Sequence, residues 1–188
     1  IQFRVEICDV STVDDLSGDG GVCLELLSVG SGLEIRRPME GSTCTVSYQS
    51  ATQGDGPQAG RQYESHLERF VTIGQRDSPL TDGLERALQS MCKGQAAMVR
   101  VAPEYAYGDE GFEGIGGKVA AGQNVEHRVT LLDFKAAGKG GLKSMSFDEQ
   151  IAFAKGIKEV GNTLFATRKP THLRRAICRY EAVDKILA

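Results

Sequence analysis

Residues 83–108 of this chain read GLERALQSMCKGQAAMVRVAPEYAYG, and this stretch decides the expected fold. In its first part, apolar side chains recur at the spacing of an amphipathic helix, at Leu84, Ala87, Leu88 and Met91. Thr81 or Asp82 can cap the start of that helix, and Gly94 can end it. The next part places Ala97, Val99 and Val101 at alternate positions, as a half-buried strand requires. The stretch therefore predicts one short helix followed by a strand.

Most segments on either side of this stretch, between residues 22 and 134, have the pattern of strands. In residues 43–48, for example, Cys44, Val46 and Tyr48 alternate with polar side chains. The connecting segments are rich in Gly, and residues 111–122 are the longest stretch without a regular pattern. We therefore expect an α+β fold, in which an antiparallel half-barrel sheet wraps around one short helix.

The pattern changes from strand to helix after residue 134. Residues 137–145 are rich in Gly and Lys and are expected to form a linker, and residues 146–188 favour two helices separated at Pro170. The expected apolar stripes are Ile151, Ala154, Ile157, Val160 or Gly161, and Leu164 on the first helix, and Leu173, Ala176, Ile177, Tyr180 and Val183 on the second. A single helical hairpin cannot bury such stripes alone, so we expect further repeats to follow it.

A short internal repeat predicts how the chain divides into domains. Residues 3–10, FRVEICDV, share their form with residues 127–134, HRVTLLDF. Two closing strands about one domain length apart predict two copies of one domain. The expected division is the last strand of an upstream domain (1–10), a linker (11–20), a complete domain (21–136), a second linker (137–145) and the hairpin (146–188). Because the chain opens on Ile1 and ends within a helical pattern, we expect it to be a segment of a longer protein.

The composition of the 188 residues, with 40% hydrophobic and 25% charged residues, is that of a globular domain. No run approaches the roughly 20 apolar residues that cross a bilayer, so no membrane association is expected. The five cysteines are scattered without a CxxC pair, and the sequence predicts neither a zinc site, nor a disulfide framework, nor a cofactor. This cysteine usage favours a reducing compartment, the cytoplasm with the nucleus as the alternative.

The net charge of −3 is unevenly distributed. Residues 141–188 carry nine Lys or Arg and five Asp or Glu, a balance of +4, so residues 1–140 sum to −7. A basic tail on an acidic body predicts an acidic partner for the tail, and the alternative is that exposed helices simply carry more Lys and Arg. Nucleic acid is not an expected partner, because the main domain is acidic and the basic cluster lacks interleaved aromatic residues.

Three segments together carry a family resemblance: residues 43–48, 83–91 and 103–108. In this order and spacing they resemble FKBP-type peptidyl-prolyl isomerases, over residues 21 to about 135, and the flanking segments resemble the large multi-domain immunophilins. The resemblance implies an isomerase domain that accepts proline-containing peptides or client proteins and tacrolimus-like macrolides. Rotation about an X-Pro bond faces a barrier of roughly 18–20 kcal/mol, which a dry pocket with fixed dipoles can lower without nucleophile, metal or general base.

The resemblance also assigns the pocket, residue by residue. It places Tyr48, Tyr63, Glu64, Thr81 and Tyr107 at catalytic positions, and Leu80, Leu84, Phe112, Ile115 and His127 around the ligand. Leu84 stands where active members most often carry Trp, His127 stands at the usual Phe, and an expected wall aromatic falls near Phe70. These departures predict weak proline binding and weak catalysis. The alternative is an inactive binding and spacer module between an active upstream domain and the helical repeats.

The helical segment carries a second resemblance. Residues 158–165, KEVGNTLF, and the spacing of Ala176 and Tyr180 resemble the first tetratricopeptide (TPR) repeat of an array. In TPR domains that bind the C-terminal tail of the ninety-kilodalton heat-shock chaperone, the Lys and Asn of this motif belong to a carboxylate clamp. Lys158 and Asn162 lie four residues apart, so they project from one helix face, and both can donate to a carboxylate. The resemblance therefore implies a chaperone-binding role.

Overall fold

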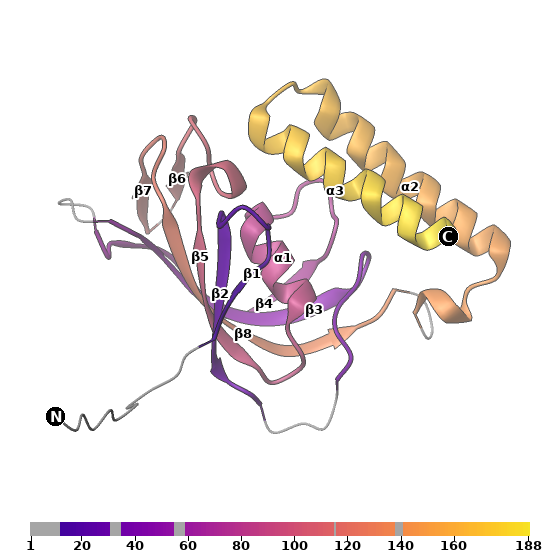
Figure 1. The fold of residues 1–188 in the computed structure, drawn as a ribbon, viewed down its shortest axis with the longest axis horizontal. Helices are drawn as coiled ribbons and strands as arrows, with labels where there is room; N and C mark the ends of the chain where they lie inside the picture. The colour runs from indigo at the N-terminus through magenta and orange to yellow at the C-terminus, as the bar shows by residue number, and fades with distance from the viewer. Residues whose placement is uncertain (1–11, 31–34, 55–58, 115, 138–140) are drawn as a thin grey trace, which may run out of the picture.

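The computed structural model describes residues 12–30, 35–54, 59–114, 116–137 and 141–188. Its main element is a six-stranded antiparallel sheet in the order β1-β2-β5-β8-β3-β4 (Figure 1). The strands are β1 (Val13–Asp15), β2 (Val22–Ser28), β3 (Thr43–Thr52), β4 (Gln62–Thr72), β5 (Ala96–Val101) and β8 (Val125–Lys135). The α+β fold class predicted from the sequence is confirmed.

The alternation of side chains along the strands explains how the sheet acquires one buried face. In β5 every second residue is buried, and Ala97, Val99 and Val101 are at most 1% exposed. In β3 the same alternation buries Cys44, Val46 and Tyr48. Because successive side chains point to opposite faces, this pattern turns one continuous apolar surface toward the inside of the curved sheet.

Helix α1 (Asp82–Ser90) lies inside the curve of the sheet (Figure 1). Thr81 caps its start, as predicted, and its side-chain Oγ1 accepts a hydrogen bond from the backbone N–H of Leu84 at 3.2 Å. Gly83 faces the side chain of Val101 so closely that a Cβ would clash, so glycine allows the helix to lie directly on β5. Fully burying a side chain such as Leu84 or Leu88 stabilises the fold by about 1.5–3 kcal/mol.

Residues 111–122 were expected to be irregular, and the structure corrects this. They contain a small antiparallel hairpin of β6 (Phe112–Gly114) and β7 (Gly117–Val119), in which Phe112 pairs with Val119. Only three residues form each strand, and glycine interrupts the alternation of apolar and polar side chains. The sequence therefore lacked the period-two signal on which the prediction of a strand depends.

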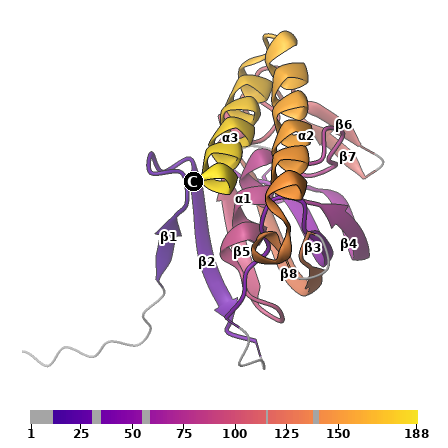
Figure 2. The same cartoon turned by 90° about the vertical axis from the view of Figure 1, so that its right-hand side faces the viewer.

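The C-terminal segment forms two antiparallel helices, α2 (Phe147–Ala166) and α3 (Pro170–Leu187), which lie side by side over α1 and one end of the sheet (Figures 1 and 2). Ser146 and Glu149 form a reciprocal capping box at the start of α2. Gly161 allows the helices to cross closely, because a Cβ there would lie 2.8 Å from the ring of Tyr180. The predicted helical hairpin is thus part of the fold, and its form is consistent with the start of a TPR array.

The predicted apolar stripe of α2 is confirmed, since Ala154, Ile157, Gly161 and Leu164 are buried. The stripe predicted for α3 is partly wrong. Ile177 is 55% exposed, whereas Arg179, which was not assigned to the stripe, is only 3% exposed. Helix α3 turns Arg179 toward the sheet domain, where buried carboxylates compensate its charge, and this rotation leaves Ile177 at the surface.

Two further expectations concern the N-terminal residues. Part of the expected linker 11–20 is a strand, because β1 pairs with β2 through Asp15 and Cys23. The expected last strand of an upstream domain, residues 1–10, lies outside the described residues. None of the helices in the described ranges is long and apolar enough to span a membrane.

Candidate functional site

Three aromatic rings meet where the resemblance places the proline pocket. Tyr107 and Phe112 are stacked, with ring centroids 4.6 Å apart and an interplanar angle of 17°. Tyr63 meets both rings edge-on, at 5.9 Å from Tyr107 and 6.0 Å from Phe112. Edge-to-face and offset contacts at these distances are the favourable aromatic geometries. The rings therefore pack on one another and fill the space between them.

Tyr48 reaches the same region from β3, and its hydroxyl is held in a polar network. It donates to Glu64 Oε1 at 2.9 Å and accepts from Arg69 Nη1 at 2.6 Å. Arg69 also donates to Glu64 at 2.8 Å, and His66 Nε2 lies 2.9 Å from the same carboxylate oxygen. Burial raises the pKa of Tyr48, so the group is a neutral phenol fixed by a carboxylate and a guanidinium.

His127 lies at the centre of the site, on β8, and is 1% exposed. Its Nδ1 is 2.7 Å from Ser50 Oγ and its Nε2 is 3.3 Å from Thr81 Oγ1. Burial lowers the pKa of His127 to about 3, so the imidazole is neutral at physiological pH. With both ring nitrogens engaged by hydroxyl groups, His127 is a hydrogen-bonded core residue that also connects β8 to the cap of α1.

The remaining assigned pocket residues have different environments. Leu80 and Leu84 are 3% and 1% exposed, and they belong to the same apolar core as Tyr48 and Tyr63. Phe70, near which the resemblance places a wall aromatic, is 71% exposed and contributes nothing to the enclosure. Ile115 lies outside the described residues. The structure therefore brings eight of the assigned residues into one cluster with His127: Tyr48, Tyr63, Glu64, Leu80, Thr81, Leu84, Tyr107 and Phe112.

Two cavities flank this cluster, and Phe112 lines both of them. The first, of about 520 Å³, runs along β4 beside Tyr63, Glu64 and Arg69. The second, of about 260 Å³, lies between Leu80, Thr81 and Tyr107 on one side and helix α3 on the other. The Tyr63 hydroxyl is buried and makes no hydrogen bond within the described ranges. The two cavities therefore open on either side of a packed aromatic centre, and the Tyr63 hydroxyl is a buried donor beside the first of them.

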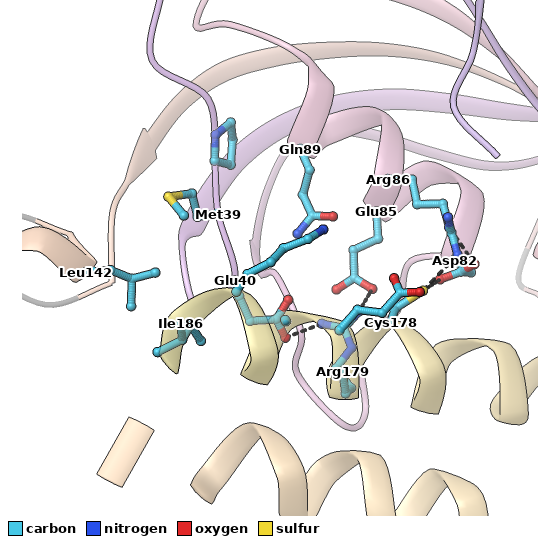
Figure 3. Close-up of a pocket in the computed structure, with 14 residues that line it drawn as sticks. Met39, Glu40, Asp82, Glu85, Arg86, Gln89, Leu142, Cys178, Arg179 and Ile186 are labelled. Atoms are coloured by element: carbon cyan, nitrogen blue, oxygen red, sulfur yellow. Dashed lines mark hydrogen bonds and ion pairs between the residues drawn. The ribbon is translucent and has the colours of Figure 1, made fainter. Parts of the chain in front are cut away.

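Helix α3 is attached to the sheet domain by a buried ionic cluster, which Figure 3 shows in the cleft between α1 and α3. Arg179 donates through Nη1 to Glu40 and through Nη2 to Glu85 Oε2, the latter at 2.8 Å. Glu40, Glu85 and Arg179 are 7%, 1% and 3% exposed. The backbone N–H of Gly74 also donates to Glu85. We call Glu40, Glu85 and Arg179 the joint.

A second set of contacts continues the joint along α3. Arg174 donates to the Tyr105 hydroxyl at 2.8 Å, and its guanidinium carbon lies 4.5 Å from the centroid of that ring. Lys169 pairs with Glu110 at 2.9 Å. The unequal charge distribution of the sequence therefore has an intramolecular explanation in this structure: cations of the basic tail pair with carboxylates of the acidic body.

The two residues assigned to a carboxylate clamp lie on α2, away from the sheet domain. Both Lys158 and Asn162 are exposed. Asn162 Oδ1 accepts a hydrogen bond from the Tyr180 hydroxyl at 2.9 Å, which fixes the orientation of the amide. The two side chains are therefore available on one helix face, as the four-residue spacing predicts.

A curved antiparallel sheet around one helix, an aromatic cluster over that helix and a docked helical hairpin together define the class of immunophilin isomerase folds. The family model described as FKBP-type peptidyl-prolyl cis-trans isomerase matches residues 35–132, which is more than half of the chain. The chain therefore belongs to the FKBP-type peptidyl-prolyl cis-trans isomerase family.

Similar proteins support this assignment. The chain is 26% identical to human peptidyl-prolyl cis-trans isomerase FKBP4 over 96% of this chain and 36% of that protein. It is 32% identical to FK506-binding protein 59 of Drosophila melanogaster over 68% of this chain and 28% of that protein. The chain thus spans about a third of the length of these curated relatives.

Solved structures share the fold. A multi-domain immunophilin from Arabidopsis thaliana has a TM-score of 0.60 at 21% identity, over 98% of this chain and 79% of that chain. The three FKBP domains of wheat FKBP73 give a TM-score of 0.58 at 24% identity, over 66% of this chain and 48% of that chain.

Sequence reasoning missed the residues of the joint. Glu40 and Arg179 are 139 positions apart, and no local period connects them. One signal was present: Arg175 and Arg179 are four residues apart, and they interrupt the apolar stripe of α3 on a single face. A pair of cations within a helix face that is otherwise apolar indicates that this face meets buried carboxylates.

Proposed function

We propose that this chain is the isomerase-type segment of a multi-domain immunophilin co-chaperone, in which this domain binds proline-containing clients and catalyses their isomerisation only weakly. The alternative is a catalytically inactive spacer that joins an active upstream domain to a chaperone-binding TPR array. Both readings use the same pocket, and they differ in whether a prolyl ring can enter it.

One observation carries the proposal: the assigned pocket is bordered by the stacked rings of Tyr107 and Phe112, and its two departures from the family pattern are the buried Leu84 and the buried, neutral His127. Leucine provides less apolar enclosure than an aromatic floor, and the imidazole together with Ser50 brings polar atoms into the centre. A transition state that has lost amide resonance benefits from a dry pocket and preorganised donors. Weaker enclosure should therefore reduce catalysis more than it reduces protein binding.

The test is protease-coupled isomerisation of an X-Pro peptide by this chain, beside the Leu84→Trp/His127→Phe double variant. We expect the unmodified chain to be near the uncatalysed rate, and the variant to gain activity at least about tenfold. A fast unmodified chain that tacrolimus inhibits would refute weak catalysis. If the double variant is folded and stays inactive, the pocket assignment itself is wrong.

We also propose that the face of α2 carrying Lys158 and Asn162 binds the acidic C-terminal tail of the ninety-kilodalton heat-shock chaperone, together with repeats that follow in the array. The supporting observation is that the Tyr180 hydroxyl donates a hydrogen bond to Asn162 Oδ1. The amide nitrogen of Asn162 therefore remains available to donate to a carboxylate. An ammonium and an amide at this spacing can share one terminal carboxylate.

This second proposal is tested with an acidic peptide that ends in a free carboxylate. Because the clamp of one repeat is incomplete, we expect weak binding, which Lys158→Ala abolishes. Lys155→Ala is the matched control, since Lys155 is also an exposed lysine of α2 and the net charge changes equally. Equal loss of binding in both variants would show that only net charge matters.

A further inference from the structure

The cavity of about 260 Å³ beside the pocket has walls from both parts of the chain. One wall belongs to the isomerase fold, through Leu80, Thr81, Tyr107 and Phe112. The other belongs to the hairpin, through Thr171, His172 and Arg175 at the start of α3. A peptide that entered the pocket from this side would contact the hairpin as well as the isomerase fold.

Helix α3 is held firmly against this opening. A Cβ on Gly108 would lie 2.9 Å from Thr171 Cγ2, so the loop after η1 (Pro103–Tyr105) closely approaches the helix. The pair between Lys169 and Glu110 joins the same loop to the start of α3. The hairpin is therefore a fixed wall of the cavity in this structure.

Arg175 is the least satisfied charged group along that wall. Its side chain is 13% exposed, and its nearest carboxylate oxygen in the ionic cluster, Glu85 Oε2, is 3.9 Å away. Glu85 is already bonded to Arg179 Nη2 at 2.8 Å. Within the described ranges, Nε of Arg175 is a buried donor that makes no hydrogen bond. A buried donor without an acceptor costs free energy, and a bound ligand that supplies an acceptor would remove this cost.

The other ionisable groups of the cavity are paired elsewhere, so they add little to the compensation that Glu85 gives Arg175 at 3.9 Å. Asp82 is bonded to Arg86 at 2.9 Å, and Glu110 is paired with Lys169 at 2.9 Å. Burial, followed by the positive charges of Arg175 and Lys169, lowers the pKa of His172, so this imidazole is neutral at physiological pH. The cavity thus presents one weakly paired guanidinium beside apolar and aromatic side chains.

We propose that α3 completes the peptide site, and that Arg175 selects prolines flanked by an acidic residue. The proline occupies the pocket bordered by Tyr107 and Phe112, and the neighbouring carboxylate accepts from the guanidinium of Arg175. Arg175 is then a specificity-determining residue supplied by the helical segment. This inference rests on the proposed function, because it requires that a proline peptide enters the pocket.

The experiment uses the full chain and two fluorescent hexapeptides, which contain one proline and differ only in Glu or Gln at both of its neighbours. Fluorescence anisotropy should give about tenfold tighter binding of the Glu peptide, since a partly buried charge-assisted hydrogen bond contributes at about this level. Arg175→Gln should abolish the preference, so that the Glu and Gln peptides bind with the same affinity.

Arg174→Gln is the matched control, because it removes one positive charge from the same helix and Arg174 lies against Tyr105 outside this cavity. It should retain the preference for Glu. A second variant, Thr171→Glu, places a negative charge on the cavity wall and should reverse the preference even if Arg175→Gln does not fold.

Three results would overturn the inference. If both peptides bind equally to the unmodified chain, the proposed function stands and the selection by Arg175 is wrong. If Arg174→Gln loses the preference as fully as Arg175→Gln, the effect is one of net charge. If neither peptide binds, both the inference and the proposed peptide-binding function fail.

Discussion

The two sides of helix α1 show two different ways of burying polar groups. On the side that faces the sheet, the buried and neutral His127 has both ring nitrogens engaged by the hydroxyl groups of Ser50 and Thr81. On the side that faces α3, Glu85 is buried as an ion against Arg179. A neutral hydrogen-bonded group costs little to bury, whereas a buried ion depends on its partner.

This difference indicates what each side can tolerate. On the pocket side, replacing His127 by an aromatic residue would remove two hydrogen bonds but would leave no buried ion without a partner. In the joint, removing a single member leaves a charge in a place that water does not reach. The attachment of the hairpin is therefore the more fragile region.

The largest expected effect is at the joint. Arg179→Met should destabilise the chain by about 3–5 kcal/mol, because the buried Glu40 and Glu85 then lose the cation that is hydrogen-bonded to both, and Arg175 lies 3.9 Å from Glu85. Unfolding in urea, followed by circular dichroism since the chain has no Trp, measures this. Lys155→Met on the exposed face of α2 is the control and should change stability little.

A compensated variant sharpens this test. Adding Glu40→Gln and Glu85→Gln to Arg179→Met removes all three charges at once and should recover most of the loss. If the triple variant is as unstable as the single one, the joint depends on shape rather than on charge.

The next effect in size is a pH dependence on the pocket side. The unfolded His127 titrates near its ordinary pKa of about 6.5, whereas burial lowers the pKa in the folded chain to about 3. Above pH 6.5 His127 is neutral in both the folded and the unfolded state, and its contribution to stability is fully present. As the pH falls from about 6.5 toward 3, only the unfolded state takes up a proton at His127. The free energy of unfolding therefore decreases by up to about 1.4 kcal/mol per pH unit.

His127→Phe should remove this slope between pH 7 and pH 5, where most carboxyl groups do not titrate. The variant loses the hydrogen bonds to Ser50 and Thr81, but that loss is constant with pH. Urea unfolding of both proteins at several pH values measures the difference in slope. Equal slopes would mean that the pKa of His127 is not lowered in the folded chain, so the imidazole would not be held neutral by burial.

The contrast between the two sides of α1 also separates what the sequence could predict from what it could not. Helix α1, its cap at Thr81 and the burial of Leu84 follow from local spacing, because each signal lies within one turn. The assignment of His127 to the pocket came from the family resemblance, and its contact with the cap residue Thr81 was found only in the structure. The joint could not be predicted, since Glu40 and Arg179 meet only through the packing of α3.

The pocket itself was predicted only in part. Eight assigned residues form the cluster with His127, but the contact between Phe112 and Tyr107 depends on the β6–β7 hairpin, whose glycine-rich sequence has no strand period. Phe70 points to solvent because it alternates with the buried Val71 and pairs with Thr45 on the outer face of the sheet. The alternation of β4 therefore contradicts a wall aromatic at this position, and the resemblance alone suggested one.

A smaller effect is expected at the crossing of the two hairpin helices. Gly161→Ala places a methyl group 2.8 Å from the ring of Tyr180 and 3.2 Å from Cβ of Arg179, so it should strain the hairpin and cost about 1–3 kcal/mol. Gly156→Ala is a control on the same helix, with no atom within 4 Å of the new methyl, and should stabilise by up to about 1 kcal/mol. If both substitutions stabilise the chain, α2 and α3 are less closely packed than described.

The smallest effect is expected where the hairpin meets the loop beside the pocket. Lys169 and Glu110 are 45% and 62% exposed, so their pairing at 2.9 Å is screened by water. Glu110→Gln should therefore cost less than about 1 kcal/mol, and salt at 0.5 M should reduce that difference further. Urea unfolding at two salt concentrations measures both. A loss as large as that of Arg179→Met, and insensitive to salt, would mean that the loop and α3 form part of the joint, so that the hairpin is attached to the pocket rim by more than an exposed ion pair.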